Sequence, residues 1–160
     1  MSVACSTHFL QVRDAEESRE AIIYRHVSGE PEYTGRDLIA FIDRVRSLPD
    51  PRLSDASYLA AKYVVYLAEL SRLQRRELDR AFGRPSSGTD DPLDFLSVGV
   101  VQDDPPDIEY LYEVVCDGSG RVRCFQPEED VDASSQPEAG VAQRRTKDGI
   151  LWVEVPIPTG

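Results

Sequence analysis

The first apolar and polar alternation in the chain covers residues 6–13, and a second apolar stretch follows at residues 21–27. A period of two in residues such as Ile, Tyr and Val is typical of a half-buried β-strand. The polar residues 14–20 between the two stretches predict a turn. We expect an antiparallel pair with Arg13 opposite Ala21 and His8 opposite His26, because this register gathers the apolar side chains on one face.

Two segments with helical spacing come next. The first is expected over residues 34–46, with Thr34 as its N-cap. The second is expected over residues 55–82, with Ser54 or Asp55 as its N-cap and Gly83 as its C-terminal stop. Residues 58–68 leave almost no polar face, so we expect the second helix to be largely buried in its first half.

The last half of the chain predicts strands rather than helices. They are expected at residues 93–101, 108–116, 121–126 and 150–156. The glycine-rich residues 117–120 join the middle two as a hairpin in which Cys116 lies opposite Val122 and Gly120 has a positive φ.

These elements follow one another in the order ββααββββ, which predicts an α+β fold. We expect one domain over residues 1–160, with two helices on one face of a mainly antiparallel sheet of five to six strands. The composition of residues 83–92 and 127–149 is that of flexible loops.

Three cysteines are present, and no C-x-x-C spacing suggests a zinc site. In the expected hairpin, Cys116 and Cys124 are diagonal neighbours, too far apart for a disulfide. We therefore expect free thiols, with Cys5 the most reactive because it lies near the terminus.

The net charge of −11 comes from 29 acidic and 18 basic residues. This acidity argues against direct nucleic-acid binding, which needs a basic surface. It leaves three interpretations open: solubility, adaptation to high salt, or a surface that imitates nucleic-acid phosphates and occupies a basic partner. No apolar run approaches the ~20 residues of a membrane span, and the N-terminus does not resemble a signal peptide. We expect a cytoplasmic protein without membrane attachment.

The junction between the second strand and the first helix is the candidate ligand site. A helix that opens at Thr34 presents unpaired N–H groups and a positive dipole end to an anion. The candidate ligand-binding residues are Tyr24, Arg25, His26, Thr34, Arg36 and Lys62. The alternative interpretation is structural, with Thr34 capping the helix and the arginines on the surface.

Other chemistry has weaker support. His8 and His26, with Cys5, Glu30 or Glu32, offer metal-ligand types, but no H-x-x-x-H spacing accompanies them. We expect no metal site and no cofactor. The chain contains no G-x-S-x-G sequence, P-loop or dinucleotide fingerprint, and we expect no enzymatic activity.

Residues Ile23, Tyr24, His26, Gly29 and Pro31 resemble a motif found in a group of small proteins of phages and prophages. In that group, an opening hairpin ends in Ile-Tyr-x-His-x-Asp-Gly-Tyr-Pro before a helix. This chain departs from the motif at Ser28, where the group usually has Asp, and at Glu30, where it usually has an aromatic residue. The resemblance implies a viral or prophage origin and a role in host interaction.

Two functional hypotheses follow from these observations. The first is a non-enzymatic acidic interaction protein of phage or prophage origin that acts on a host protein, such as a defence protein or another host factor with a basic surface. The alternative is a protein that binds a small anionic or nucleotide-like ligand at residues 24–36. The sequence leaves open whether the chain forms a homo-oligomer.

Overall fold

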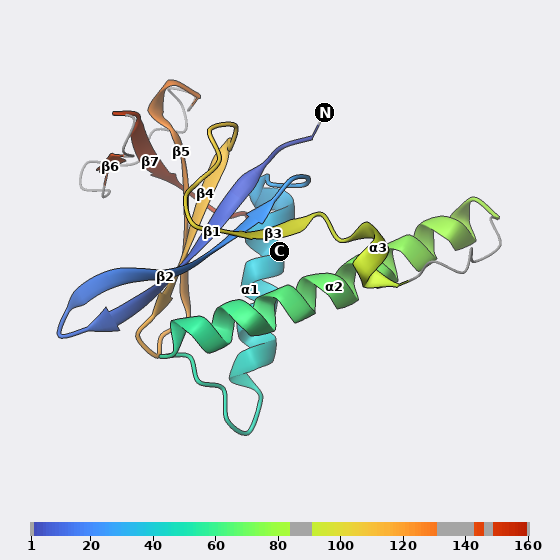
Figure 1. Ribbon diagram of the computed structural model, residues 1–160, viewed down its shortest axis with the longest axis horizontal. Coiled ribbons are helices and arrows are strands. Elements are labelled where there is room, and N and C mark those ends of the chain that lie inside the picture. Colours follow the sequence, from blue (N-terminus) through green and yellow to red (C-terminus); the bar gives the residue numbers. More distant parts are fainter. Residues whose placement is uncertain (1, 84–90, 131–142, 146–148, 160) are drawn as a thin grey trace.

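The computed structural model describes residues 2–83, 91–130, 143–145 and 149–159 (Figure 1). These residues form one seven-stranded sheet with the strand order β3-β2-β1-β4-β5-β7-β6. The strands are β1 (Cys5–Arg13), β2 (Glu16–Arg25), β3 (Val98–Val101), β4 (Tyr110–Cys116), β5 (Arg121–Pro127), β6 (Gln143–Arg145) and β7 (Leu151–Val155). The helices are η1 (Pro31–Gly35, a π-helix), α1 (Arg36–Arg46), α2 (Ala56–Ala81), α3 (Pro92–Phe95) and η2 (Glu128–Asp130, a 3₁₀-helix).

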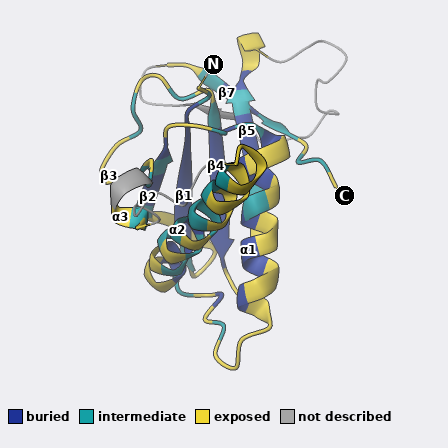
Figure 2. Cartoon of the chain, turned by 90° about the vertical axis from the view of Figure 1, so that its right-hand side faces the viewer, coloured by how far each residue is buried: buried dark blue, intermediate teal, exposed yellow. Residues whose placement is uncertain are grey.

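The α+β class and the mostly antiparallel sheet are confirmed, but the detailed order is not. The described residues add a strand and three short helices to the expected ββααββββ. In addition, β1 pairs with β4 in parallel, with Cys5 opposite Tyr110. The two long helices of the β2–β3 connection, α1 and α2, lie on one side of the sheet (Figure 2). The return from β3 to β4, residues 102–109, uses the other side, where Asp104 contacts His8.

The register expected for the first hairpin is wrong. Asp14 and Ala15 both have positive φ, 52° and 65°, and form a two-residue turn, the geometry that matches the twist of paired strands. As a result β2 begins at Glu16, and His8 lies opposite Ile22 instead of His26. A β-bulge after Phe9 then shifts the pairing of the two strands by one residue, which returns their apolar side chains to the buried face. The polar residues 16–20 are all exposed, so their pairing costs no burial of charge.

The second hairpin has the expected strands but is shifted by two residues. Val114, rather than Cys116, lies opposite Val122. Gly120 has the expected positive φ of 67°. All three cysteines are free, as expected, but Cys5 is fully buried in β1 rather than on a loose terminus.

Apolar spacing explains the two long helices. In α1, Leu38, Phe41, Ile42 and Val45 are buried, at intervals that put them on one face. The Asp55 side chain accepts a hydrogen bond from the Tyr58 N–H and caps α2. Tyr63 of α2 packs between the rings of Phe9 and Phe41, at centroid distances of 5.8 and 5.2 Å.

The expected deep burial of α2 is wrong. Its buried residues are Ala56, Leu59, Ala60, Tyr63 and Leu67. A single sheet lies beneath the helix, and α1 and α3 lie beside it, so the outward face stays open, and Val65 is 66% exposed. The C-terminal part of the helix extends past the edge of the sheet (Figure 1), and Leu67 is the last buried residue of the helix.

Parts of the expected loops are ordered elements. Residues 92–95 form α3, which shortens the expected strand over 93–101 to Val98–Val101. Residues 128–130 form η2 and residues 143–145 form β6. Residues 84–90, 131–142 and 146–148 lie outside the described residues. None of the described helices has the length and apolar character needed to cross a membrane.

Candidate functional site

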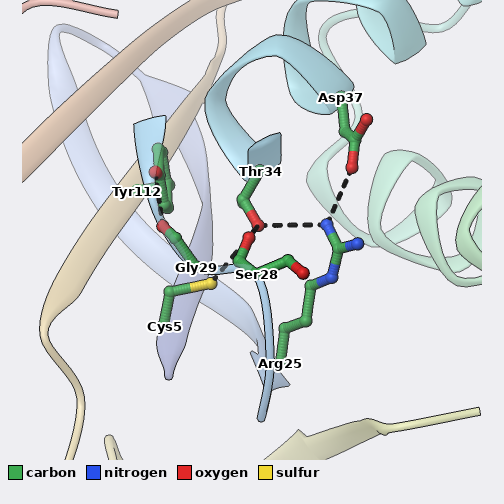
Figure 3. A network of polar contacts seen from close by, with 7 residues as sticks. All are labelled: Cys5, Arg25, Ser28, Gly29, Thr34, Asp37 and Tyr112. Atoms are coloured by element: carbon green, nitrogen blue, oxygen red, sulfur yellow. Dashed lines mark hydrogen bonds and ion pairs between the residues drawn. The ribbon is translucent and has the colours of Figure 1, made fainter. Parts of the chain in front are cut away.

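The strand–helix junction is a packed polar node (Figure 3). Arg25, at the end of β2, donates hydrogen bonds to Thr34 Oγ1 at 3.0 Å and to Asp37 Oδ2 at 2.8 Å. Thr34 in turn donates to the carbonyl of Ser28 at 2.7 Å. Arg25 is only 9% exposed and Thr34 is fully buried. Because the arginine charge already has a carboxylate partner, the node acts first as a structural joint between β2 and α1.

Two further contacts fix the node to the sheet. The Cys5 thiol of β1 donates to Thr34 Oγ1 at 3.7 Å, and the Tyr112 hydroxyl of β4 donates to the Gly29 carbonyl at 2.7 Å. A Cβ on Gly29 would lie 2.8 Å from the carbonyl oxygen of Val3, so the backbone there requires glycine. Burial raises the pKa of Tyr112, which keeps its hydroxyl a proton donor.

The predicted anion site required a helix that starts at Thr34 with unpaired N–H groups, and the first helix does not start in that way. Thr34 does not cap α1, because its side chain bonds Ser28 and the chain enters α1 through η1. The N–H groups of Tyr33 and Thr34 both donate to the Glu30 carbonyl, and that of Arg36 donates to Pro31 and Tyr33. These donors are already used within the backbone.

The six candidate residues do not converge. Arg25 and Thr34 meet in the node on the helix side of the sheet. Tyr24 points to the opposite side, where its hydroxyl lies 2.9 Å from His26 Nδ1. Arg36 is exposed at the start of α1. Lys62 lies in α2, where its Nζ donates to the carbonyl of Pro51 at 3.5 Å.

The two histidines do not form a metal site together. His8 Nε2 contacts Asp104 Oδ1 at 2.7 Å, whereas His26 is paired with Tyr24. Burial alone would raise the pKa of Asp104, but the hydrogen bond and charge of His8 outweigh it and lower the pKa. Among the described residues, no group of three or more His, Cys, Asp or Glu side chains could hold a metal ion.

A polar row crosses the sheet face opposite the helices. His8 of β1 lies opposite Glu113 of β4, which lies opposite Arg123 of β5. Arg123 bridges Glu113 and Glu17, with nitrogen–oxygen distances of 3.0 and 3.1 Å. Glu113 is 3% exposed, so its charge needs this partner. Arg123 is thus ion-paired with both Glu113 and Glu17, and we interpret the row as a structural element.

One end of the sheet is strongly acidic. Leu111 of β4 lies opposite Phe125 of β5, which brings the residues just before β4 beside those just after β5 (Figure 1). Burial raises the pKa of Tyr110 most, and the charges of Glu32, Glu30 and Glu109 raise it further. The Gly29 and Glu109 N–H groups donate to the adjacent carbonyls of Val3 and Ala4, both at 2.9 Å, which places the segment leading into η1 at the same end. We call residues 26–35, 105–109 and 126–130 the acidic end. Asp103 and Asp104 lie further along the sheet, beside Arg19 and His8.

The acidic end contains seven Asp and Glu residues and no Lys or Arg. It also exposes apolar groups, with Tyr33 58% and Val27 39% exposed. The helical layer, residues 36–83, is different: it carries nine Lys and Arg and seven Asp and Glu. The helical layer therefore has a net charge of +2, and the rest of the chain carries −13.

The sequence indicated that the chain is acidic, but not where the acidic residues come together in the fold. Three segments distant along the chain make the acidic end, and only the sheet order brings them together. The signal available in the sequence was the absence of Lys and Arg from each of the three segments. At the predicted junction, Arg25 and Thr34 bond each other and the neighbouring groups of Asp37 and Ser28.

Comparison of the chain with family models, curated proteins and solved structures found no match.

Proposed function

We propose that this chain is a non-enzymatic interaction protein that binds a basic surface of another protein through its acidic end. A phage or prophage origin, and a host protein as the partner, are part of the proposal. They are supported by the motif at Ile23, Tyr24, His26, Gly29 and Pro31.

The observation that carries the proposal is the composition of the acidic end. Seven carboxylates without a Lys or Arg in the same segments create a concentrated negative potential, which steers a basic partner and favours its orientation. Tyr33, exposed among these carboxylates, supplies the aromatic anchor that protein interfaces favour.

The small-anion alternative has less support from the geometry. Arg25 and Thr34 already bond Asp37 and Ser28. Glu30 and Glu32 stand beside the same junction and would repel an anion. We therefore propose a single function.

Two charge-matched variants test the proposal. Each removes four negative charges from the chain, so their net charges are equal. The acidic-end variant carries Glu32→Gln, Glu109→Gln, Glu128→Gln and Glu129→Gln. The control variant carries four changes in the helical layer, namely Asp43→Asn, Asp50→Asn, Glu77→Gln and Asp79→Asn.

Each protein, with Tyr33→Ala as a third variant, is immobilised and exposed to bacterial lysate at about 50 and 300 mM salt. We expect a basic protein that the wild type and the control retain and that the acidic-end and Tyr33→Ala variants lose. Retention should weaken at the higher salt, because screening shortens the reach of the charges. Equal retention by both charge variants would contradict the proposal, as would catalytic turnover abolished by a single side-chain change.

A further inference from the structure

The outward face of α2 carries an exposed stripe of apolar residues, at one end of which the Arg52 guanidinium lies 4.5 Å from the centroid of the Tyr58 ring. Val65 is 66% exposed, Leu73 53% and Tyr58 50%. Lys62 and Glu69 lie between them, and the intervals of four, three, four and four residues put all five on one helical face. At 1.5 Å per residue, residues 58–73 make a face roughly 24 Å long. We call these five residues the α2 stripe.

A groove of about 360 Å³ runs beside the α2 stripe, between α2 and α1. Its floor and walls are mostly apolar and include Phe41, Val45, Leu48, Ala61 and Tyr66. An exposed stripe next to an apolar groove is an unusual feature of a surface that faces only water.

The charges on the α2 stripe are unevenly paired. Glu69 accepts from Arg44 at 2.8 Å. The Lys62 ammonium has only the Pro51 carbonyl, at 3.5 Å. Among the described residues, no carboxylate lies within ion-pair distance of Lys62. The partner that completes this face must therefore present a carboxylate opposite Lys62.

The positions of the α2 stripe are spaced symmetrically about its centre. A two-fold axis between Val65 and Tyr66 would place an antiparallel copy of α2 against the first. Lys62 would then face Glu69 of the second copy, Tyr58 would face Leu73 of the second copy, and Val65 would lie near the axis. Such an isologous contact makes each pairing twice.

We propose that a second copy of this chain covers the α2 stripe, through antiparallel packing of the two α2 helices about this axis. The helical layer has nine basic and seven acidic residues, so two chains of net charge −11 can approach there without strong repulsion. Four helical turns per copy make an interface of modest size, and we expect a reversible dimer with a dissociation constant on the order of micromolar. The inference does not depend on the acidic end.

Sedimentation velocity at about 5 to 100 µM chain tests the proposal. The wild type should shift from 17.9 kDa to twice that mass across this range. Val65→Asp should remain a monomer. Val100→Asp is the matched control, because Val100 is also an exposed valine, 74% exposed, but lies in the edge strand β3. It should dimerise as the wild type does.

Charge reversal provides a second readout that a structural effect would not reproduce. Lys62→Glu alone and Glu69→Lys alone each place like charges opposite one another in a homodimer, so each should be a monomer. An equimolar mixture of the two variants restores both opposite-charge pairs and should form a heterodimer. Circular dichroism checks that every variant is folded.

Three outcomes would overturn the proposal. One is a wild type that is monomeric at 100 µM. Another is a dimer broken by Val100→Asp and untouched by Val65→Asp, which would place the interface at the edge of the sheet. The last is a mixture of the two charge variants that remains monomeric.

Discussion

Among the contacts of the strand–helix node, the Arg25–Asp37 ion pair is the one at which a single substitution should affect stability most. The side chains are 11% and 20% exposed and their charged atoms lie 2.8 Å apart. Asp37→Asn removes the negative charge but keeps the shape, and leaves the Arg25 charge buried without its counter-ion. We expect the free energy of unfolding to fall by about 2 kcal/mol, measured by urea denaturation. Asp43→Asn, at an exposed ion pair on the same helix, should change it by less than about 0.5 kcal/mol.

The three thiols give a second prediction for single residues. Burial raises the pKa of Cys5 to about 11 and the pKa values of Cys116 and Cys124 to about 12. Since only the thiolate reacts readily, none should be labelled by a maleimide at pH 8 in the folded protein. All three should be labelled in guanidinium, and an introduced Val100→Cys, at a position that is 74% exposed, should react at once without denaturant. Rapid labelling of native Cys5 would show that the start of β1 is not held as described.

For the elements, the approach of the β2–η1 connection to β1 depends on Gly29. A Cβ there would meet the Val3 carbonyl oxygen at 2.8 Å and the Cβ of Cys5 at 3.0 Å. Gly29→Ala should therefore push the connection away from β1 and lower the free energy of unfolding by about 1–3 kcal/mol. Gly99→Ala is the control, because a Cβ on Gly99 meets nothing within 4 Å. Equal stability of the two variants would mean that the connection adjusts freely.

Local patterns predicted the helices well. The α2 bounds, Ala56–Ala81, differ by one residue at each end from the expected 55–82, because apolar spacing and the Asp55 cap are local signals. The predicted register of the first hairpin was wrong for an equally local reason. Its turn uses positive φ at Asp14 and Ala15, where the sequence offers no glycine as a signal. The parallel pairing of β1 with β4 was not predicted, because no local sequence pattern determines which strands become neighbours.

The candidate site was predictable only in part. The motif around Tyr24 and His26 does mark a constrained junction, and Arg25 and Thr34 are central to it. Their roles were not predictable, because the groups that satisfy them, Ser28 and Asp37, depend on the path through η1. The acidic end depends on the sheet order in the same way.

On the scale of the whole molecule, the chain separates its charge. The acidic end carries the negative potential and an exposed Tyr33, while the helical layer is nearly neutral and carries the α2 stripe. One surface is thereby suited to a basic partner and the other to a second copy of the chain. The two contacts are compatible because they use different residues.

Carboxyl footprinting tests the central claim most directly. The chain is labelled with a carbodiimide and an amine, free and in complex with the protein that the capture experiment identifies, and the modified residues are located by mass spectrometry. We predict that Glu32, Glu109, Glu128 and Glu129 lose labelling in the complex, while Glu77 of α2 is labelled equally in both states. Unchanged labelling at the acidic end, with protection of Glu77 instead, would contradict the claim that the acidic end is the binding surface.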